Sequence, residues 1–121
     1  MKELKILIVD DEKEFVQAFI ELLTALGYPQ VYGAQTAEAG WDIVQRENPA
    51  LIFCDLKFSY GTNGTELLRQ VRRSNSSTSF IMMTGYTDSE EKENALKLGA
   101  QAVVYKPLQL DQIKQIIEEF G

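Results

Sequence analysis

Three carboxylates in this sequence lie at the ends of apolar runs. A buried charge there is costly unless an ion pair, a hydrogen bond or a metal ion compensates it. Asp10 and Asp11 directly follow the run Ile6–Val9, and Asp55 lies near the end of the run Pro49–Leu56. Both runs are short and rich in residues that suit a buried strand. We therefore predict that two strands bring the three aspartates to one place.

A cluster of three carboxylates favours a bound divalent cation. Two carboxylates within ~4 Å of each other repel by roughly 4 kcal/mol at an effective dielectric constant of about 20. Oxygen ligands favour a hard ion, and Mg²⁺, which keeps several waters and shares a phosphate, fits an open cluster better than Ca²⁺ does. The sequence has no histidine, and Cys54 is expected on the strand face opposite Asp55, so a zinc site is not expected.

The same cluster suits phosphoryl transfer. A metal held by Asp10 and Asp11 would neutralise an incoming phosphoryl group, which Asp55 is placed to attack. Lys106 and Thr84 follow two later apolar runs and add an ammonium and a hydroxyl. Phosphoryl transfer depends mainly on positioning and charge neutralisation, so these groups are nearly sufficient. Each residue alone has a more ordinary interpretation, as a turn former, helix cap or solvated side chain, but their joint position favours a site.

These residues depend on an alternating chain of strands and helices for their positions. Strands are expected at 5–9, 30–34, 51–54, 80–83 and 102–105, and helices at about 36–46, 65–73 and 89–98. The first helix is expected to end at Gly27 and to turn inward Phe15, Phe19, Leu22 and Leu26, and the last to turn inward Leu110, Ile113, Ile117 and Phe120. Such alternation predicts a parallel sheet covered on both faces, which binds ligands beyond the carboxyl ends of its strands.

The whole-chain composition narrows the class of protein. The 121 residues suit one domain, and 45% hydrophobic with 25% charged residues is ordinary for a globular protein. A net charge of −6 disfavours direct binding of nucleic acid or anionic membranes. One cysteine cannot form an internal disulfide, and no stretch is long enough to span a membrane, so we expect a cytoplasmic protein.

Four motifs in order resemble the receiver domain of two-component response regulators. Val9-Asp10-Asp11-Glu12 is similar to its acidic pair, Asp55 to its phosphoacceptor, Thr84-Gly85 to its hydroxyl switch residue and Lys106-Pro107 to its lysine with a cis peptide. The sequence alone predicts a trans bond there. The resemblance covers residues 1–121 as one CheY-like receiver (response regulatory) domain. It implies an α/β fold with a single doubly wound, flavodoxin-like parallel sheet of five strands, in the order 2-1-3-4-5, and five helices.

The resemblance also implies a phosphorelay signalling switch, that is, a phosphoprotein. Its donor would be a sensor histidine kinase or a histidine phosphotransfer protein, and phosphorylation would change the affinity for a downstream target protein or output domain. The chain would catalyse only its own phosphorylation and dephosphorylation, so it is not expected to be an enzyme. The implied site residues are the Mg²⁺ ligands Asp10, Asp11, Asp55 and the main-chain carbonyl of Lys57, and the phosphoryl contacts Thr84 and Lys106.

The sequence departs from the family pattern in two places. Receivers usually carry an aromatic residue three positions before the lysine, but here that position is Val103. Our hypothesis is that Tyr105 or Tyr86 takes its place. The loop after Asp55 lacks the usual proline and is one residue longer than usual. Lys57 and Tyr86 occupy positions that gate attacking water in the family, so we predict that they set the lifetime of the phosphoryl group.

Three other functions fit parts of the sequence. An aspartyl phosphatase needs a second aspartate two residues after the nucleophile, where this chain has Lys57. A flavodoxin-like flavin carrier needs a phosphate-cradling loop after the first strand, where this chain has two carboxylates. A degenerate receiver that acts as a phosphorylation-independent protein-docking module is the remaining alternative, which Val103 keeps open.

Overall fold

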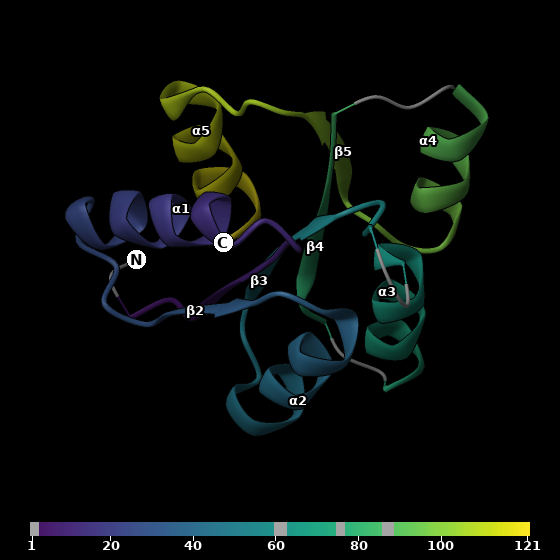
Figure 1. The fold of residues 1–121 in the computed structure, drawn as a ribbon, viewed down its shortest axis with the longest axis horizontal. Coiled ribbons are helices and arrows are strands. Elements are labelled where there is room, and N and C mark those ends of the chain that lie inside the picture. The colour runs from purple at the N-terminus through teal and green to yellow at the C-terminus, as the bar shows by residue number, and fades with distance from the viewer. Residues whose placement is uncertain (1–2, 60–62, 75–76, 86–88) are drawn as a thin grey trace.

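The computed structural model describes residues 3–59, 63–74, 77–85 and 89–121, which form one parallel sheet with helices on both faces (Figure 1). The strands lie in the order β2-β1-β3-β4-β5, and every pair is parallel. The predicted fold class and strand order are confirmed. The elements are β1 (Ile6–Val9), α1 (Lys13–Ala25), β2 (Val31–Ala34), α2 (Ala37–Glu47), β3 (Leu51–Asp55), α3 (Gly64–Arg73), β4 (Ser79–Thr84), α4 (Ser89–Lys97), β5 (Ala102–Tyr105) and α5 (Leu110–Phe120).

Two apolar cores lie on opposite faces of the sheet, because successive side chains of a strand point to opposite sides. Leu7, Ile52 and Met82 pack with α2, α3 and α4 on one face. Ile8 and Phe53 pack with α1 and α5 on the other. Figure 1 shows α1 and α5 side by side on that second face. β1 and β3 are buried along their whole length, as expected for central strands covered on both sides.

The register of the sheet brings the strand ends to one edge. Val9 of β1 lies opposite Cys54 of β3, so Asp10 follows at the level of Asp55. Asp55 in turn lies opposite Met83 of β4, one residue before Thr84. The carboxyl ends of β1, β3 and β4 therefore meet, as the alternating sequence predicted.

The helix boundaries follow signals in the sequence. The side chain of Thr36 caps α2 by accepting a hydrogen bond from the backbone N–H of Ala39. Asn48 ends α2 with a φ of 49°, in the left-handed region that asparagine tolerates. Gly27 follows α1 with a φ of 103°, which fits its predicted role as a stop.

The predicted inward faces of the first and last helices were partly wrong. In α5, Leu110 is 43% exposed, whereas Ile116, which the pattern missed, is buried. Helical side chains point toward the N-terminus, so a residue in the first position extends beyond the packed part of its helix. In α1 the buried residues are Val16, Phe19 and Leu23, and the other predicted positions Phe15, Leu22 and Leu26 are half-buried.

None of the described helices is long and apolar enough to cross a membrane.

Candidate functional site

Asp10, directly after β1, is completely buried, and both of its oxygens are engaged. Its Oδ1 accepts a hydrogen bond from the backbone N–H of Glu12 at 2.9 Å. Its Oδ2 accepts one from the ammonium of Lys106 at 2.5 Å. The burial of this charge is tolerated because the carboxylate is both paired and hydrogen-bonded.

Asp11 joins two loops that lie far apart in the sequence. Its Oδ2 accepts a hydrogen bond of 2.6 Å from the backbone N–H of Ser59, in the loop after β3. This bond lowers the pKa of Asp11 and outweighs the opposing effect of its partial burial. Asp11 therefore stays ionised at the edge of the site, where a metal ion needs an anionic ligand.

Asp55, the last residue of β3, is only 7% exposed. Burial and then the charge of Asp10 raise the pKa of Asp55 to about 6, against the opposing effect of Lys106. A carboxylate with such a pKa remains largely ionised at neutral pH. The raised pKa also means that the charge is poorly compensated by the protein alone.

Lys106 supplies the positive charge that faces these aspartates. Its Nζ lies 3.5 Å from Oδ1 of Asp55 in addition to its bond with Asp10. Burial lowers the pKa of Lys106, but the hydrogen bond and charge of Asp10, together with Asp55, outweigh it and leave the pKa raised. The Nζ also lies 4.6 Å from the centre of the Phe15 ring, a cation–π distance.

The backbone around Lys106 fixes the direction of its side chain. Its N–H donates a hydrogen bond of 2.8 Å to the carbonyl of Thr84, and its peptide bond to Pro107 is cis. The cis geometry that the resemblance implied is thus present. The ammonium approaches the aspartates from the side of β5.

The three aspartates fit a metal ion. One carboxylate oxygen from each of Asp10, Asp11 and Asp55 lies within 4.8 Å of the others. An all-oxygen donor set of this kind suits Mg²⁺. Cys54 is fully buried in the core beneath α2 and α3, and burial raises the pKa of its thiol well above the usual value. The thiol is therefore neutral and contributes nothing to metal binding.

Gly64 lets the start of α3 lie against the end of β3. A Cβ atom at this position would lie 2.0 Å from the backbone oxygen of Asp55 and 3.1 Å from Sγ of Cys54. No side chain fits in that space, so α3 can begin beside the end of β3 only with glycine. Its backbone N–H donates a hydrogen bond to the carbonyl of Leu56 at 3.1 Å.

Comparison with known proteins identifies the family to which this chain belongs. The family model for the response regulator receiver domain matches residues 6–118. The chain belongs to the receiver domain family. Sporulation initiation phosphotransferase F of Bacillus subtilis is 30% identical over 116 residues, which cover 96% of this chain and 92% of the relative. A probable chemotaxis protein CheY of Rhizobium etli is 29% identical over 119 residues, covering 97% of this chain and 92% of the relative.

Solved receiver structures share the fold. The CheY-like receiver domain protein of Methanospirillum hungatei superposes with a TM-score of 0.89 and 32% identity, covering 98% of this chain and 94% of that chain. Some relatives are much longer: this chain spans 32% of the regulatory protein YesN of Bacillus subtilis. The receiver domain thus occurs both as nearly the whole of a relative and as one part of it.

The structure also places most of the remaining residues singled out from the sequence. Thr84 is buried at the end of β4, opposite Tyr105 of β5. The ammonium of Lys57 pairs with the carboxylate of Glu91 on α4 at 2.7 Å, and the metal-binding role of its carbonyl stays a prediction. Val103 is buried and Tyr105 is 48% exposed. Tyr86 lies outside the described residues, so the hypotheses about it stay open.

Sequence reasoning missed two contributors to the receiver site. Phe15 was predicted to be a core residue, but it is half-buried and its ring contacts the Lys106 ammonium. Its spacing within α1 could not separate these roles, because both require an apolar residue on the same helix face. Ser59 contributes its backbone N–H to Asp11, and a backbone group leaves no signal in residue type.

Proposed function

We propose that this receiver domain is a phosphorylation-dependent switch in which Asp55 accepts a phosphoryl group. The observation that carries the proposal is the meeting of Asp10, Asp11 and Asp55 at one edge of the sheet, with Lys106 against two of them. Mg²⁺ is the proposed cofactor, held by these carboxylates and by the main-chain carbonyl of Lys57. When bound, it would offset the negative charge of the aspartates and of the phosphoryl oxygens.

In this proposal, Asp55 and Lys106 have different roles in the transfer of the phosphoryl group. An oxygen of Asp55 attacks phosphorus, the phosphorus–nitrogen bond of a phosphohistidine donor breaks, and an acyl phosphate forms on Asp55. The imidazole of the donor leaves with the electron pair of that bond and takes up a proton. Lys106, with its Nζ 3.5 Å from Asp55, neutralises charge on the transferring group. Attack by water at the phosphorus later releases phosphate and resets Asp55.

The donor must bring the histidine, because this chain contains none. An apolar groove of about 170 Å³ lies between α1 and the start of α5, where Phe15, Leu22 and Pro107 are among its lining residues. Phe15 contacts Lys106, so the groove reaches the edge of the phosphorylation site. We assign the docking of a histidine kinase or histidine phosphotransfer protein to this groove.

The outcome of phosphorylation is a changed affinity for a downstream target protein or output domain. The phosphoryl group adds roughly one to two negative charges beside Lys106, which is already shared by two carboxylates. We infer that Lys106 and the hydroxyl of Thr84 turn toward the new group. Thr84 and Lys106 are joined by a backbone hydrogen bond, so a shift of either one moves the ends of β4 and β5 together. The chain catalyses only its own phosphorylation and dephosphorylation in this proposal.

Intact-protein mass spectrometry tests the function directly. We expect incubation with Mg²⁺ and acetyl phosphate to add one labile phosphoryl group, and Asp55→Ala or omission of Mg²⁺ to prevent it. Asp111→Ala, which removes an exposed aspartate on α5, is the matched control and should be phosphorylated normally. An absent adduct under all conditions would favour the phosphorylation-independent docking module, and multiple turnovers of phosphate esters would favour a phosphatase.

A further inference from the structure

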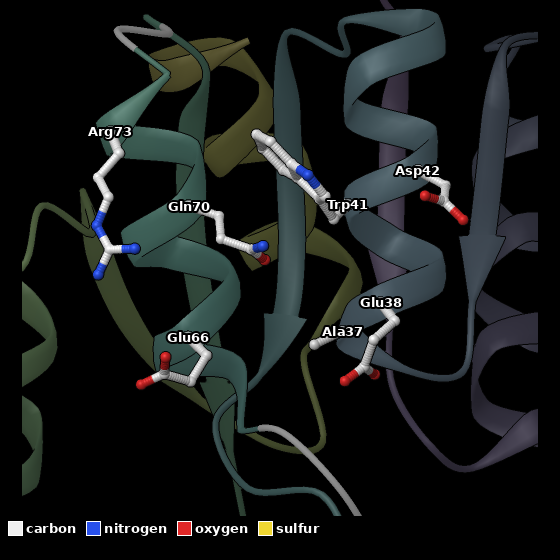
Figure 2. A pocket seen from close by; sticks show the side chains of 7 residues that line it. All are labelled: Ala37, Glu38, Trp41, Asp42, Glu66, Gln70 and Arg73. Carbon is white, nitrogen blue, oxygen red and sulfur yellow. The ribbon is translucent and has the colours of Figure 1, made fainter.

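A second pocket lies away from the phosphorylation site, in the groove between α2 and α3 (Figure 2). Its volume is about 470 Å³, within the range of pockets that bind small ligands. Its lining residues are Ala37, Glu38, Trp41, Asp42, Glu66, Gln70 and Arg73. None of these takes part in the proposed phosphoryl transfer.

Trp41 forms the apolar part of this pocket. It is partly buried against the core beneath α2 and α3, and the rest of the side chain lines the open groove. Figure 2 shows the indole extending from α2 toward α3, into the space between the two helices. A tryptophan that lines a pocket is a frequent anchor for a binding partner, and its ring face attracts cations.

Acidic side chains lie toward one end of the pocket. Glu38 and Glu66 stand in the first turns of α2 and α3, toward the same end of the groove (Figure 2). Asp42 lies on the side of α2 that faces away from α3 in the same view. An acidic residue in a first turn also stabilises its own helix, so these charges alone do not indicate a ligand. Their position at a pocket lined by a partly buried indole adds an apolar contact surface for the stem of a basic side chain.

We propose that the α2–α3 groove binds a lysine or arginine side chain of a partner protein, packed on Trp41 and with its charge met by Glu38 and Glu66. Charge complementarity supports this occupant, since Glu38 and Glu66 lie at the end of the pocket away from Arg73, in a chain whose net charge is −6. The inference goes beyond the phosphorylation switch and does not depend on it.

Two arginines, Arg69 and Arg73, determine which end of the groove a basic side chain can occupy. Glu66 already pairs with Arg69 within α3, but the two side chains are 47% and 39% exposed, and a solvent-exposed pair of this kind is weak enough to exchange with an incoming cation. Arg73 lies at the opposite end of the groove, at the end of α3. It repels a cation there, so the basic side chain must enter near the first turns of the two helices. An acidic group of the same partner segment would fit beside Arg73.

The tryptophan provides its own readout, because Trp41 is the only tryptophan in the chain. The probe is an acetylated, amidated tri-arginine peptide, and tri-glutamine of the same form is the neutral control. We expect tri-arginine to change the Trp41 fluorescence saturably and to shift backbone amide signals of α2 and α3 in NMR spectra recorded with Mg²⁺ present. Tri-glutamine should do neither.

Variants separate a specific site from general attraction. We expect the double change Glu38→Gln with Glu66→Gln to weaken binding of labelled tri-arginine about fivefold, and Trp41→Phe to weaken it about twofold to fivefold. Arg73→Gln should strengthen it. The double change Glu118→Gln with Glu119→Gln removes the same charge from exposed positions on α5 and should leave binding unchanged apart from long-range screening.

Three results would overturn the proposal. One is the same loss of affinity in the α5 double variant as in the groove double variant, because general electrostatics would then explain binding. Another is a set of NMR shifts confined to Asp10, Asp11 and Asp55, which would place the cation at the carboxylate cluster. The last is no saturation by tri-arginine at millimolar concentration. Phosphorylation of Asp55 is measured separately, so failure of one proposal leaves the other standing.

Discussion

Carboxylates line both the cluster after β1 and β3 and the α2–α3 groove, but they are buried in the cluster and exposed to solvent in the groove. In the cluster, Asp10 is fully buried and Asp55 is 7% exposed, and Lys106 is held against both. In the groove, Glu38 is exposed and the side chain of Glu66 is 47% exposed. The groove carboxylates therefore lie near solvent, and Glu66 also pairs with Arg69, whereas buried protein groups must compensate the charges of the cluster. Mutations in the cluster should change stability strongly, and those in the groove should change mainly binding.

Removal of the Lys106 ammonium should give the largest effect on stability. We expect Lys106→Ala to lower the free energy of unfolding by about 3 kcal/mol, because Asp10 is left charged, buried and without its cation. Urea denaturation of the metal-free protein at pH 7 measures the change. Lys5→Ala is the matched control: its ion pair with Glu47 is exposed by 37% and 25%, and its loss should cost under about 1 kcal/mol. Equal losses would contradict the comparison.

Gly64→Ala should give the next largest effect. The added Cβ would lie 2.0 Å from the backbone oxygen of Asp55, so α3 or the end of β3 must move. We expect a loss of about 2 kcal/mol in the free energy of unfolding and a weaker Mg²⁺ affinity by calorimetry. A Cβ on Gly85 meets nothing within 4 Å, so Gly85→Ala is the control. Unchanged stability and Mg²⁺ binding in Gly64→Ala would show that the start of α3 can move away from the backbone oxygen of Asp55 at little cost in free energy.

Asp55→Asn should stabilise the metal-free protein. The pKa of Asp55 is about 6 in the folded protein and 3.8 in the reference state, so the folded state holds the proton more tightly. The unfolding free energy of the parent protein therefore falls as pH rises from about 4 to about 6, and stays lowered above that. We expect Asp55→Asn to gain about 2 kcal/mol at pH 7 and little at pH 4.

Thermal and urea unfolding at the two pH values test this expectation. Mg²⁺ should stabilise the parent protein more than Asp55→Asn, because the variant lacks one anionic ligand. Asp111→Asn on the exposed face of α5 should show neither effect. A gain that persists at pH 4 would mean that charge is not its source.

Glu38→Gln should have the smallest effect on stability. The carboxylate is exposed and in the first turn of α2, where its favourable interaction with the helix dipole is worth under about 1 kcal/mol. We expect urea denaturation to show a loss within that range, while the tri-arginine affinity falls measurably. A loss as large as that of Lys106→Ala would mean that Glu38 has a structural role.

Much of the site could be predicted from the sequence, because the carboxyl ends of the strands in a parallel sheet meet at one edge. The runs before Asp10 and Asp55 were enough to predict that these carboxylates converge, and the register of β1 and β3 agrees. The exposure of Leu110 and the burial of Ile116 were not predictable in the same way. Both residues fit an apolar helical stripe, and only the position of the helix end relative to the sheet separates them.

The sequence by itself determined the alternation of strands and helices, the five-stranded parallel sheet and the gathering of the aspartates, because each follows from local periodicity and from the order of elements. Tertiary structure alone decided that Lys106 pairs with Asp10 more closely than with Asp55. It also decided that the backbone N–H of Ser59 binds Asp11, and that Phe15 contacts the ammonium. These contacts join residues far apart in the chain, and their distances depend on how loops and helices pack rather than on residue type.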